Sequence, residues 1–136
     1  QKYIDYVGAQ AITAARIVIR QGEITERIVV QYRDRIKVIK ERADAVTHQA
    51  PAYVPPAADA RCAVPVGFVV LHDAAARGVD PQPASGLDEA AGSGVALSTV
   101  ADTVAGNYAQ CHQWREQLIA LQAWAREQSD VAGIRE

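Results

Sequence analysis

Hydrophobic residues recur with a seven-residue period along the first part of the chain. One series runs from Ile4 to Val46 and a second from Gly8 to Ala43, and they alternate at steps of four and three residues. This spacing places both series on one side of a helix, as in a coiled coil. The pattern predicts an N-terminal coiled-coil arm over residues 1–48, whose seam consists of Ile4, Gly8, Ala11, Ala15, Val18, Gly22, Thr25, Val29, Tyr32, Ile36, Ile39, Ala43 and Val46.

Two features of this arm leave a second interpretation open. Several isoleucines lie outside the two series, so the apolar surface is wider than a two-helix contact requires: Ile12, Ile17, Ile19, Ile24 and Ile28. Residues 28–38 also alternate between apolar and polar positions, which is typical of a strand. We expect helix for this segment and keep a local strand as the alternative.

The second half of the chain carries the clearest amphipathic helix. Ser98 is the predicted N-cap, and Asp102 follows in the first turns, where the helix dipole favours an anion. Large apolar residues then recur at steps of three or four. The pattern predicts a helix over residues 98–129 and a polar tail over 130–136, with an apolar side made of Val100, Val104, Tyr108, Cys111, Trp114, Leu118, Leu121 and Trp124.

The segment between these helices, residues 49–97, holds all six prolines. Pro65 before an apolar run and Gly78 after it predict a short helix at about residues 66–77. Residues 79–96, rich in Gly, Pro, Ser and Asp, are typical of a loop. The predicted fold class is all-α: two long amphipathic, coiled-coil helices joined by a Pro/Gly-rich hinge that contains the short helix.

Charge narrows the choice of partners. The chain has 136 residues and a net charge of −2, which does not favour nucleic-acid binding. Residues 33–42 hold five basic and two acidic residues. This stretch is either a solvated helix face or a surface that binds lipid headgroups or an acidic partner. In a parallel, in-register pair of first arms, Arg35 would face the partner's Lys40. This repulsion favours an acidic partner, or a staggered or antiparallel arrangement.

The residues with catalytic potential do not form a recognisable site. His72 precedes Asp73, and Cys111 precedes His112, but consecutive residues on a helix do not face each other. No spacing places a third orienting group or a set of metal ligands. We therefore expect a non-enzymatic interaction protein with no catalytic residue, metal or cofactor. Trp114 and Trp124 either anchor a partner or pack against the first arm.

The two cysteines bear on the compartment in which the protein resides, and the first residue bears on whether the chain is a fragment. Cys62 and Cys111 could bridge within the chain or across a dimer if the compartment is oxidising. The chain starts at Gln1 and contains no methionine, so we expect a processed or trimmed fragment of a longer protein. No apolar run reaches the roughly 18 residues of a transmembrane helix.

Three stretches resemble one family. YVPPAADARCAVPVGFVVLHDAAARG (53–78) and VALSTVADTVAGNYAQCHQWREQLIALQAWAREQ (95–128) resemble the Rz-like inner-membrane spanins of tailed bacteriophages. ERIVVQYRDRIKVIKERAD (26–44) is similar to the juxtamembrane helical arm of these proteins. The resemblance covers nearly the whole chain, and it rests on a cysteine-containing helix pattern, not on a catalytic signature.

The resemblance implies a lysis function in a Gram-negative host. It implies an N-terminal anchor in the inner membrane, which this chain does not contain, and a helical body in the periplasm. This body would be a homodimer, commonly disulfide-linked, with Cys62 and Cys111 as the candidate residues. Its C-terminal end would bind an outer-membrane spanin lipoprotein, and the pair would disrupt or fuse the outer membrane at the end of lysis. The candidate interface residues are Val104, Tyr108, Trp114, Leu118, Leu121 and Trp124.

Two other functions remain as alternatives. The chain could be a structural coiled-coil adaptor of a phage particle or of a bacterial envelope complex, with neither a membrane anchor nor a lipoprotein partner. A cysteine- or histidine-dependent hydrolase is the weaker alternative, and it would lose activity on Cys111→Ser without a change of oligomeric state. Family members have been labelled endopeptidases, but this sequence offers no protease constellation.

Overall fold

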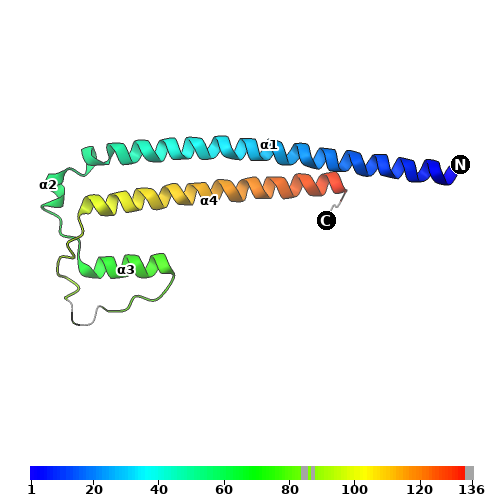
Figure 1. The fold of residues 1–136 in the computed structure, drawn as a ribbon. Helices are drawn as coiled ribbons and strands as arrows, with labels where there is room; N and C mark the ends of the chain where they lie inside the picture. The colour runs from blue at the N-terminus through cyan, green and yellow to red at the C-terminus, as the bar shows by residue number, and fades with distance from the viewer. Residues whose placement is uncertain (84–85, 87, 134–136) are drawn as a thin grey trace. The chain divides into compact units, whose positions relative to one another are not determined.

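The computed structural model describes residues 1–83, 86 and 88–133, and within these ranges all regular elements are helices. They are α1 (Lys2–Tyr53), α2 (Pro56–Asp59), α3 (Val66–Arg77) and α4 (Leu97–Ala132) (Figure 1). The predicted all-α class, with two long helices and a short helix between them, is confirmed. The strand alternative for residues 28–38 is excluded, because α1 is helical throughout that segment.

The chain divides into two compact units. The helix-pair unit comprises Gln1–Glu41 and Ala109–Glu136, and therefore most of α1 and the C-terminal part of α4. The middle unit comprises Arg42–Tyr108, with the last turns of α1, helices α2 and α3, and the first turns of α4.

Helix α1 is long because nothing in the sequence interrupts it before residue 51. Pro51 lies inside the helix and contributes no backbone N–H, yet the helix continues, and Val54 N donates to Ala50 O at 2.8 Å. The helix ends at Tyr53, and Val54 separates it from Pro55, which is extended (φ −72°, ψ 160°) and precedes α2. Its end thus lies five residues beyond the end of the arm predicted from the pattern.

The core of the helix-pair unit lies between α1 and α4. Ile24 and Ile28 are its most deeply buried members, with 5% and 6% of their surface exposed. The half-buried residues of α1 continue this line at steps of three or four residues, close to the period of about 3.6 of an α-helix. They are Ile17, Gln21, Tyr32, Ile36 and Ile39.

Before Tyr32, the residues of α1 that face α4 do not coincide with the predicted seam. Val18 and Val29 belong to that seam but are exposed, at 66% and 38%. Ile24 and Ile28, which lie outside it, make the contact. A strict seven-residue repeat drifts by about 20° per heptad around a straight helix, so the residues that face α4 leave the repeat after a few turns.

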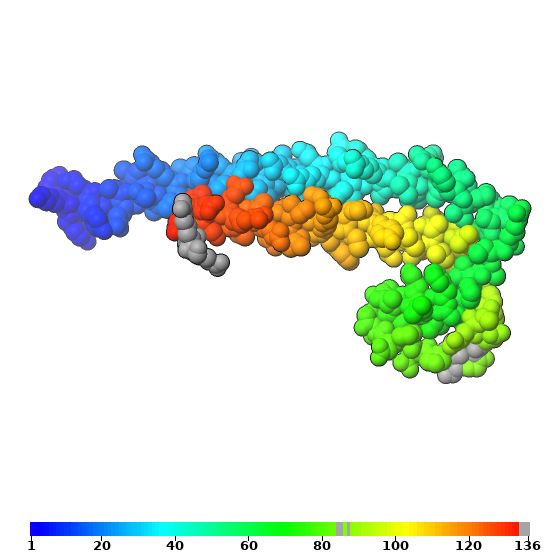
Figure 2. All heavy atoms as spheres, turned by 180° about the vertical axis from the view of Figure 1, so that it is seen from behind, coloured from blue at the N-terminus to red at the C-terminus, as the bar shows by residue number. Residues whose placement is uncertain are grey.

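The side of α4 that contacts α1 consists mostly of alanine and polar residues. Figure 2 shows the orange and red residues of α4 lying along α1. Alanine on one helix lets large side chains such as Ile24 and Ile28 of the other pack close to the backbone. The half-buried residues on this side of α4 are Ala109, Gln113, Glu116, Ile119, Ala120, Ala123, Glu127, Gln128 and Val131.

In the middle unit, the ends of α3 follow from Pro65 and Gly78. Pro65 is extended (φ −70°, ψ 151°) and directly precedes the first helical residue. Gly78 ends the helix in the left-handed conformation, with φ 66°, which glycine adopts without a steric penalty. The helix predicted at residues 66–77 is therefore confirmed at both ends, and Ala74 on its inner side is 2% exposed.

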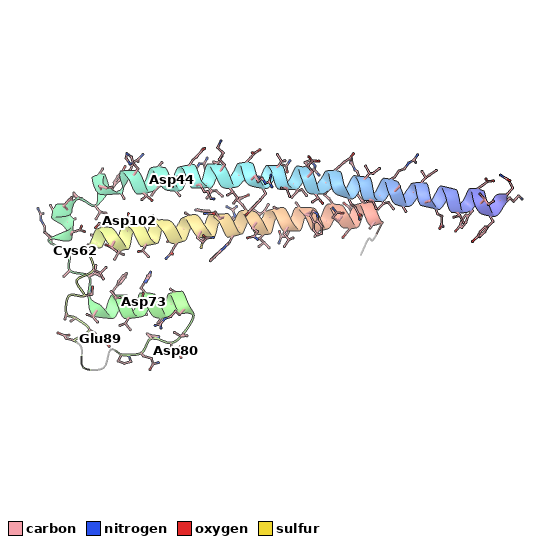
Figure 3. The ribbon with its side chains drawn as sticks, viewed as in Figure 1. Asp44, Cys62, Asp73, Asp80, Glu89 and Asp102 are labelled. Carbon is pink, nitrogen blue, oxygen red and sulfur yellow. The ribbon has the colours of Figure 1, made fainter. Side chains whose placement is uncertain are left out.

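The segment after α3 returns to pack beside the start of this helix. Gly67 N donates to Glu89 O at 2.9 Å, and Ser93 N donates to Val64 O at 2.8 Å. A Cβ atom on Gly67 would lie 3.2 Å from Glu89 O, so glycine permits this close approach. Figure 3 labels Glu89 on the returning segment and Asp73 on α3. These backbone contacts hold the middle unit together around Val64, which is 5% exposed.

Candidate functional site

In the helix-pair unit, α4 has two sides with different chemistry. One side contacts α1 through alanine and polar residues. The opposite side carries Cys111, Trp114, Leu118, Leu121 and Ala125 at steps of three and four residues, and we call these five residues the outer face of α4. Trp114, Leu118 and Leu121 are 61%, 55% and 58% exposed. The largest apolar side chains of this helix segment therefore do not form its core.

The structure places all six predicted interface residues on α4 and leaves all of them exposed. Val104 and Tyr108 belong to the middle unit, and the other four to the helix-pair unit. Trp124 differs from the rest, because its indole Nε1 donates to Thr25 Oγ1 on α1 at 2.9 Å. Of the two alternatives for the tryptophans, contact with the first arm therefore holds for Trp124, whereas Trp114 is exposed.

Polar contacts also link α1 and α4 within the helix-pair unit. Gln128 Nε2 donates to Gln21 O at 3.0 Å. Arg35 forms an ion pair with Glu116 at 3.3 Å, and Arg27 pairs with Glu127. Exposed ion pairs contribute at most about 1 kcal/mol each, so these contacts orient the helices more than they hold them together. The basic stretch of α1 thus has one acidic partner on α4.

Asp59 and Ser98 connect α2 to the first turn of α4 in the middle unit. Ser98 N donates to Asp59 Oδ1 at 2.8 Å, and Ser98 Oγ donates to Asp59 Oδ2 at 2.7 Å. The prediction of Ser98 as the N-cap is wrong, because Ser98 is the second residue of α4. Asp59 accepts the free N–H at this helix end instead. The donation from Ser98 N, and then that from the hydroxyl, holds the pKa of Asp59 below its usual value of 3.8.

The middle unit also contains a shallow groove between α3 and the first turns of α4. Its volume is about 230 Å³, and Phe68, Val95 and Val100 supply apolar parts of its lining. His72 and Asp73 lie at this groove, with His72 Nδ1 and Asp73 Oδ1 3.2 Å apart. This contact joins two consecutive residues, and the Asp73 side chain is 61% exposed, so the pair is a local surface contact.

Cys62 and Cys111 are both exposed free thiols in this structure. Cys62 lies in the turn between α2 and α3, where Figure 3 labels it, and Cys111 lies on the outer face of α4. The two cysteines belong to different units, and a bridge within the chain or between two copies stays a prediction.

The described residues contain neither a metal site nor a membrane span of the usual kind. Within residues 1–83, 86 and 88–133, no three His, Cys, Asp or Glu side chains gather as metal ligands would. In the same ranges, no helix combines the length and the hydropathy of a bilayer-crossing segment.

Sequence reasoning missed two features of these units. The first is the role of Asp59, since nothing in a short proline-flanked segment indicates which distant helix end it meets. The second is the exposure of the N-terminal turns of α1, where residues 1–16 are all exposed although several are large and apolar, namely Tyr3, Ile4, Tyr6, Val7 and Ile12. The sequence did contain a signal for this exposure. Several isoleucines lie outside the two seven-residue series, so the apolar surface of the helix is wider than one helix contact covers.

Comparison of the chain with protein-family models, with curated proteins and with solved structures finds no match.

Proposed function

We propose that this chain is the periplasmic part of a Rz-like inner-membrane spanin, which pairs with an outer-membrane lipoprotein to disrupt or fuse the outer membrane at host lysis. In this proposal the chain is not an enzyme and uses no cofactor. The resemblance of residues 26–44, 53–78 and 95–128 to that family is the starting point.

One observation carries the proposal furthest: the chain keeps most of its large apolar side chains on its surface. Among the described residues, only four hydrophobic side chains are buried, namely Ile24, Ile28, Val64 and Ala74. Exposed apolar surface of this extent is typical of proteins that complete their packing against a partner. The groove lined by Phe68, Val95 and Val100 is shallow, whereas a small-molecule site is usually a deep cleft.

The length of α1 also supports a role between two membranes. Its 52 residues correspond to a single helix of roughly 78 Å at 1.5 Å per residue. In the proposal, a membrane anchor precedes Gln1, and α1 carries the rest of the chain away from the inner membrane. The exposed apolar surfaces would then supply the free energy of association with the lipoprotein, because burying them releases water.

Deleting the reading frame from the phage genome that carries it tests this function. We expect peptidoglycan cleavage to proceed normally after lysis is triggered, while release of cell contents is blocked at the outer membrane. Re-supply of the full-length reading frame should restore release. Unchanged release after deletion would refute the proposal and favour a structural adaptor.

A single substitution adds a residue-level test of the same function. Leu118→Asp places a charge on the outer face of α4, and we expect it to abolish release without affecting peptidoglycan cleavage. His112→Asp is the matched control, since His112 is exposed on the same helix but lies off the outer face. Release that is normal in the Leu118→Asp variant would count against the proposal.

A further inference from the structure

The groove between α3 and the first turns of α4 combines an apolar lining with an exposed aromatic ring. Phe68 and Val69 come from α3, Val100 from α4, and Val95 from the segment before α4. Phe68 is the single phenylalanine of the chain, and 44% of its surface is exposed. A large apolar side chain that lines a groove and stays open in this way is typical of a surface that packs against a partner.

Phe68 and His72 together form an aromatic side of this groove. Their ring centroids lie 6.3 Å apart and their planes are inclined by 23°, so the two rings are stacked one turn apart on α3. Aromatic rings prefer offset or edge-to-face neighbours at centroid distances of about 4.5–7 Å. This side of the groove therefore favours an aromatic occupant over an aliphatic one.

The groove has the size of one large side chain. Its volume is about 230 Å³. An apolar cavity of about 150 Å³ is sufficient for a benzene ring, whereas sites for drug-sized molecules usually measure about 300–1,000 Å³. The groove therefore suits a single ring that belongs to a longer chain, and the rest of that chain would run over the surface.

The carboxylate of Asp73 lies at the groove and is open to a cation. Its side chain is 61% exposed, and among the described residues its ion-pair partner is the neighbouring His72, which carries a charge only when it is protonated. Arg77 donates from Nε to the backbone O of Asp73 at 3.1 Å and not to the carboxylate. A lysine or an arginine of an incoming chain can therefore pair with Asp73.

The charge of the middle unit favours a basic occupant as well. Residues 42–108 contain seven acidic residues and three basic ones, which gives this unit a net charge of −4. The helix-pair unit, with eleven basic and nine acidic residues, has a net charge of +2. A field of one sign attracts a partner of the opposite sign and repels one of the same sign. An acidic segment or an anionic lipid surface is therefore a poor occupant of this groove.

We propose that the groove binds a basic segment of another protein, which inserts one aromatic side chain between α3 and α4 and places a lysine or an arginine beside Asp73. The inference goes beyond the proposed function, whose residue-level test concerns the outer face of α4. It stands on the middle unit alone.

A short peptide tests this recognition by fluorescence anisotropy with the purified full chain. The probe is the rhodamine-labelled peptide KKGFGKK, and we expect saturable binding with a dissociation constant on the order of 100 µM, as one side chain in a shallow groove supplies. The peptide with alanine in place of phenylalanine should bind about tenfold more weakly, because burial of the ring supplies most of the affinity. The peptide with glutamate in place of lysine should not bind, and added salt should weaken the binding of the probe.

A pair of threonine variants locates the bound ring. Thr103 lines the groove and is exposed, so Thr103→Phe fills the groove from α4 without entering a core, and we expect it to weaken the binding about tenfold. Thr13→Phe is the matched control, because Thr13 on α1 is also exposed and its hydroxyl likewise donates to the carbonyl four residues earlier. It should leave the dissociation constant unchanged. Circular dichroism confirms that both variants keep their helix content.

A pair of aspartate variants separates a local ion pair from the overall charge. Asp73 lies at the groove, whereas Asp80 belongs to the segment after α3 and does not line the groove (Figure 3). Both Asp73→Asn and Asp80→Asn remove one negative charge from the middle unit. We expect Asp73→Asn to weaken the binding about threefold, as the loss of an exposed ion pair does, and Asp80→Asn to have less than half of this effect.

Four outcomes would overturn the proposal. Absence of saturable binding up to about 1 mM peptide leaves the groove without a basic occupant. Equally tight binding of the glutamate peptide shows that charge is not recognised. Equal losses within either pair of variants place the peptide elsewhere. Self-association of the free chain that Thr103→Phe abolishes assigns the groove to a second copy. Each outcome is read from purified protein, so it is independent of whether deleting the reading frame affects lysis.

Discussion

Replacing Ile28 by alanine tests whether the helix pair is held together by the residues that the structure buries. Ile28 is 6% exposed and contacts α4, whereas Ile19 on the same helix is 62% exposed. The two isoleucines permit the same chemical change at a buried and at an exposed position. A purely seven-residue seam predicts no such difference, because neither isoleucine belongs to it.

The expected magnitude follows from this burial. Removing a well-buried isoleucine side chain costs about 2–5 kcal/mol. The contact between two helices is open at its sides, so neighbouring groups and water can enter the space, and we expect Ile28→Ala to cost about 2 kcal/mol, near the low end. Ile19→Ala loses little buried area and gains a few tenths of a kcal/mol in helix propensity, so its effect should be about zero.

Urea unfolding followed by circular dichroism and by tryptophan fluorescence measures both effects. Trp124 reports on the helix-pair unit, because its indole bonds to Thr25 on α1. The comparison uses midpoints at an unchanged slope, so that a change in the unfolded state is detected. Equal destabilisation by Ile28→Ala and Ile19→Ala, or a larger effect at Ile19, would refute the assignment of the core.

Three further predictions concern single residues. Gly22→Ala should stabilise the chain by about 1 kcal/mol in urea unfolding, because alanine is the better helix former and its Cβ atom would meet nothing within 4 Å. A loss of stability would show a packing role for Gly22. Thr25→Val should cost about 1 kcal/mol and change the tryptophan emission, since Trp124 Nε1 loses its acceptor and Gln128 Nε2 keeps only Gln21 O. The pKa of Asp59 is lower in the folded chain than its usual value of 3.8. The contribution of Asp59 to stability is therefore complete above about pH 3.8, and it is lost as the pH falls through the pKa of the folded chain. Asp59→Asn should therefore be less stable than the natural chain at neutral pH, and the gap should close in acid; a gap that is constant with pH would contradict this linkage.

The arrangement of α4 shows why burial is hard to read from one helix alone. Its most hydrophobic residues, such as Trp114 and Leu118, would be the natural choice for the core, yet they are exposed. Alanine on the other side accommodates Ile24 and Ile28, and Thr25 gives the edge residue Trp124 a hydrogen-bond acceptor. Large side chains against small ones pack more closely than isoleucine against leucine and tryptophan.

The sequence by itself determined the helices. The lack of proline before residue 51 allowed α1, and Pro65 and Gly78 set both ends of α3, because these residues act through their own backbone geometry. The periodicity of the second half was sufficient to predict α4, since helix formation depends on neighbours within a few residues.

Only the tertiary structure decided which sides of the helices meet. The sequence offered two apolar lines on α1, and the contact with α4 uses Ile24 and Ile28 from outside the seven-residue seam before it joins the seam at Tyr32. It likewise turned the alanine side of α4 toward α1, and it brought Asp59 to Ser98 from 39 residues away. These choices depend on the competition between whole surfaces that are distant in the chain, and no local pattern contains the shape of the opposing surface.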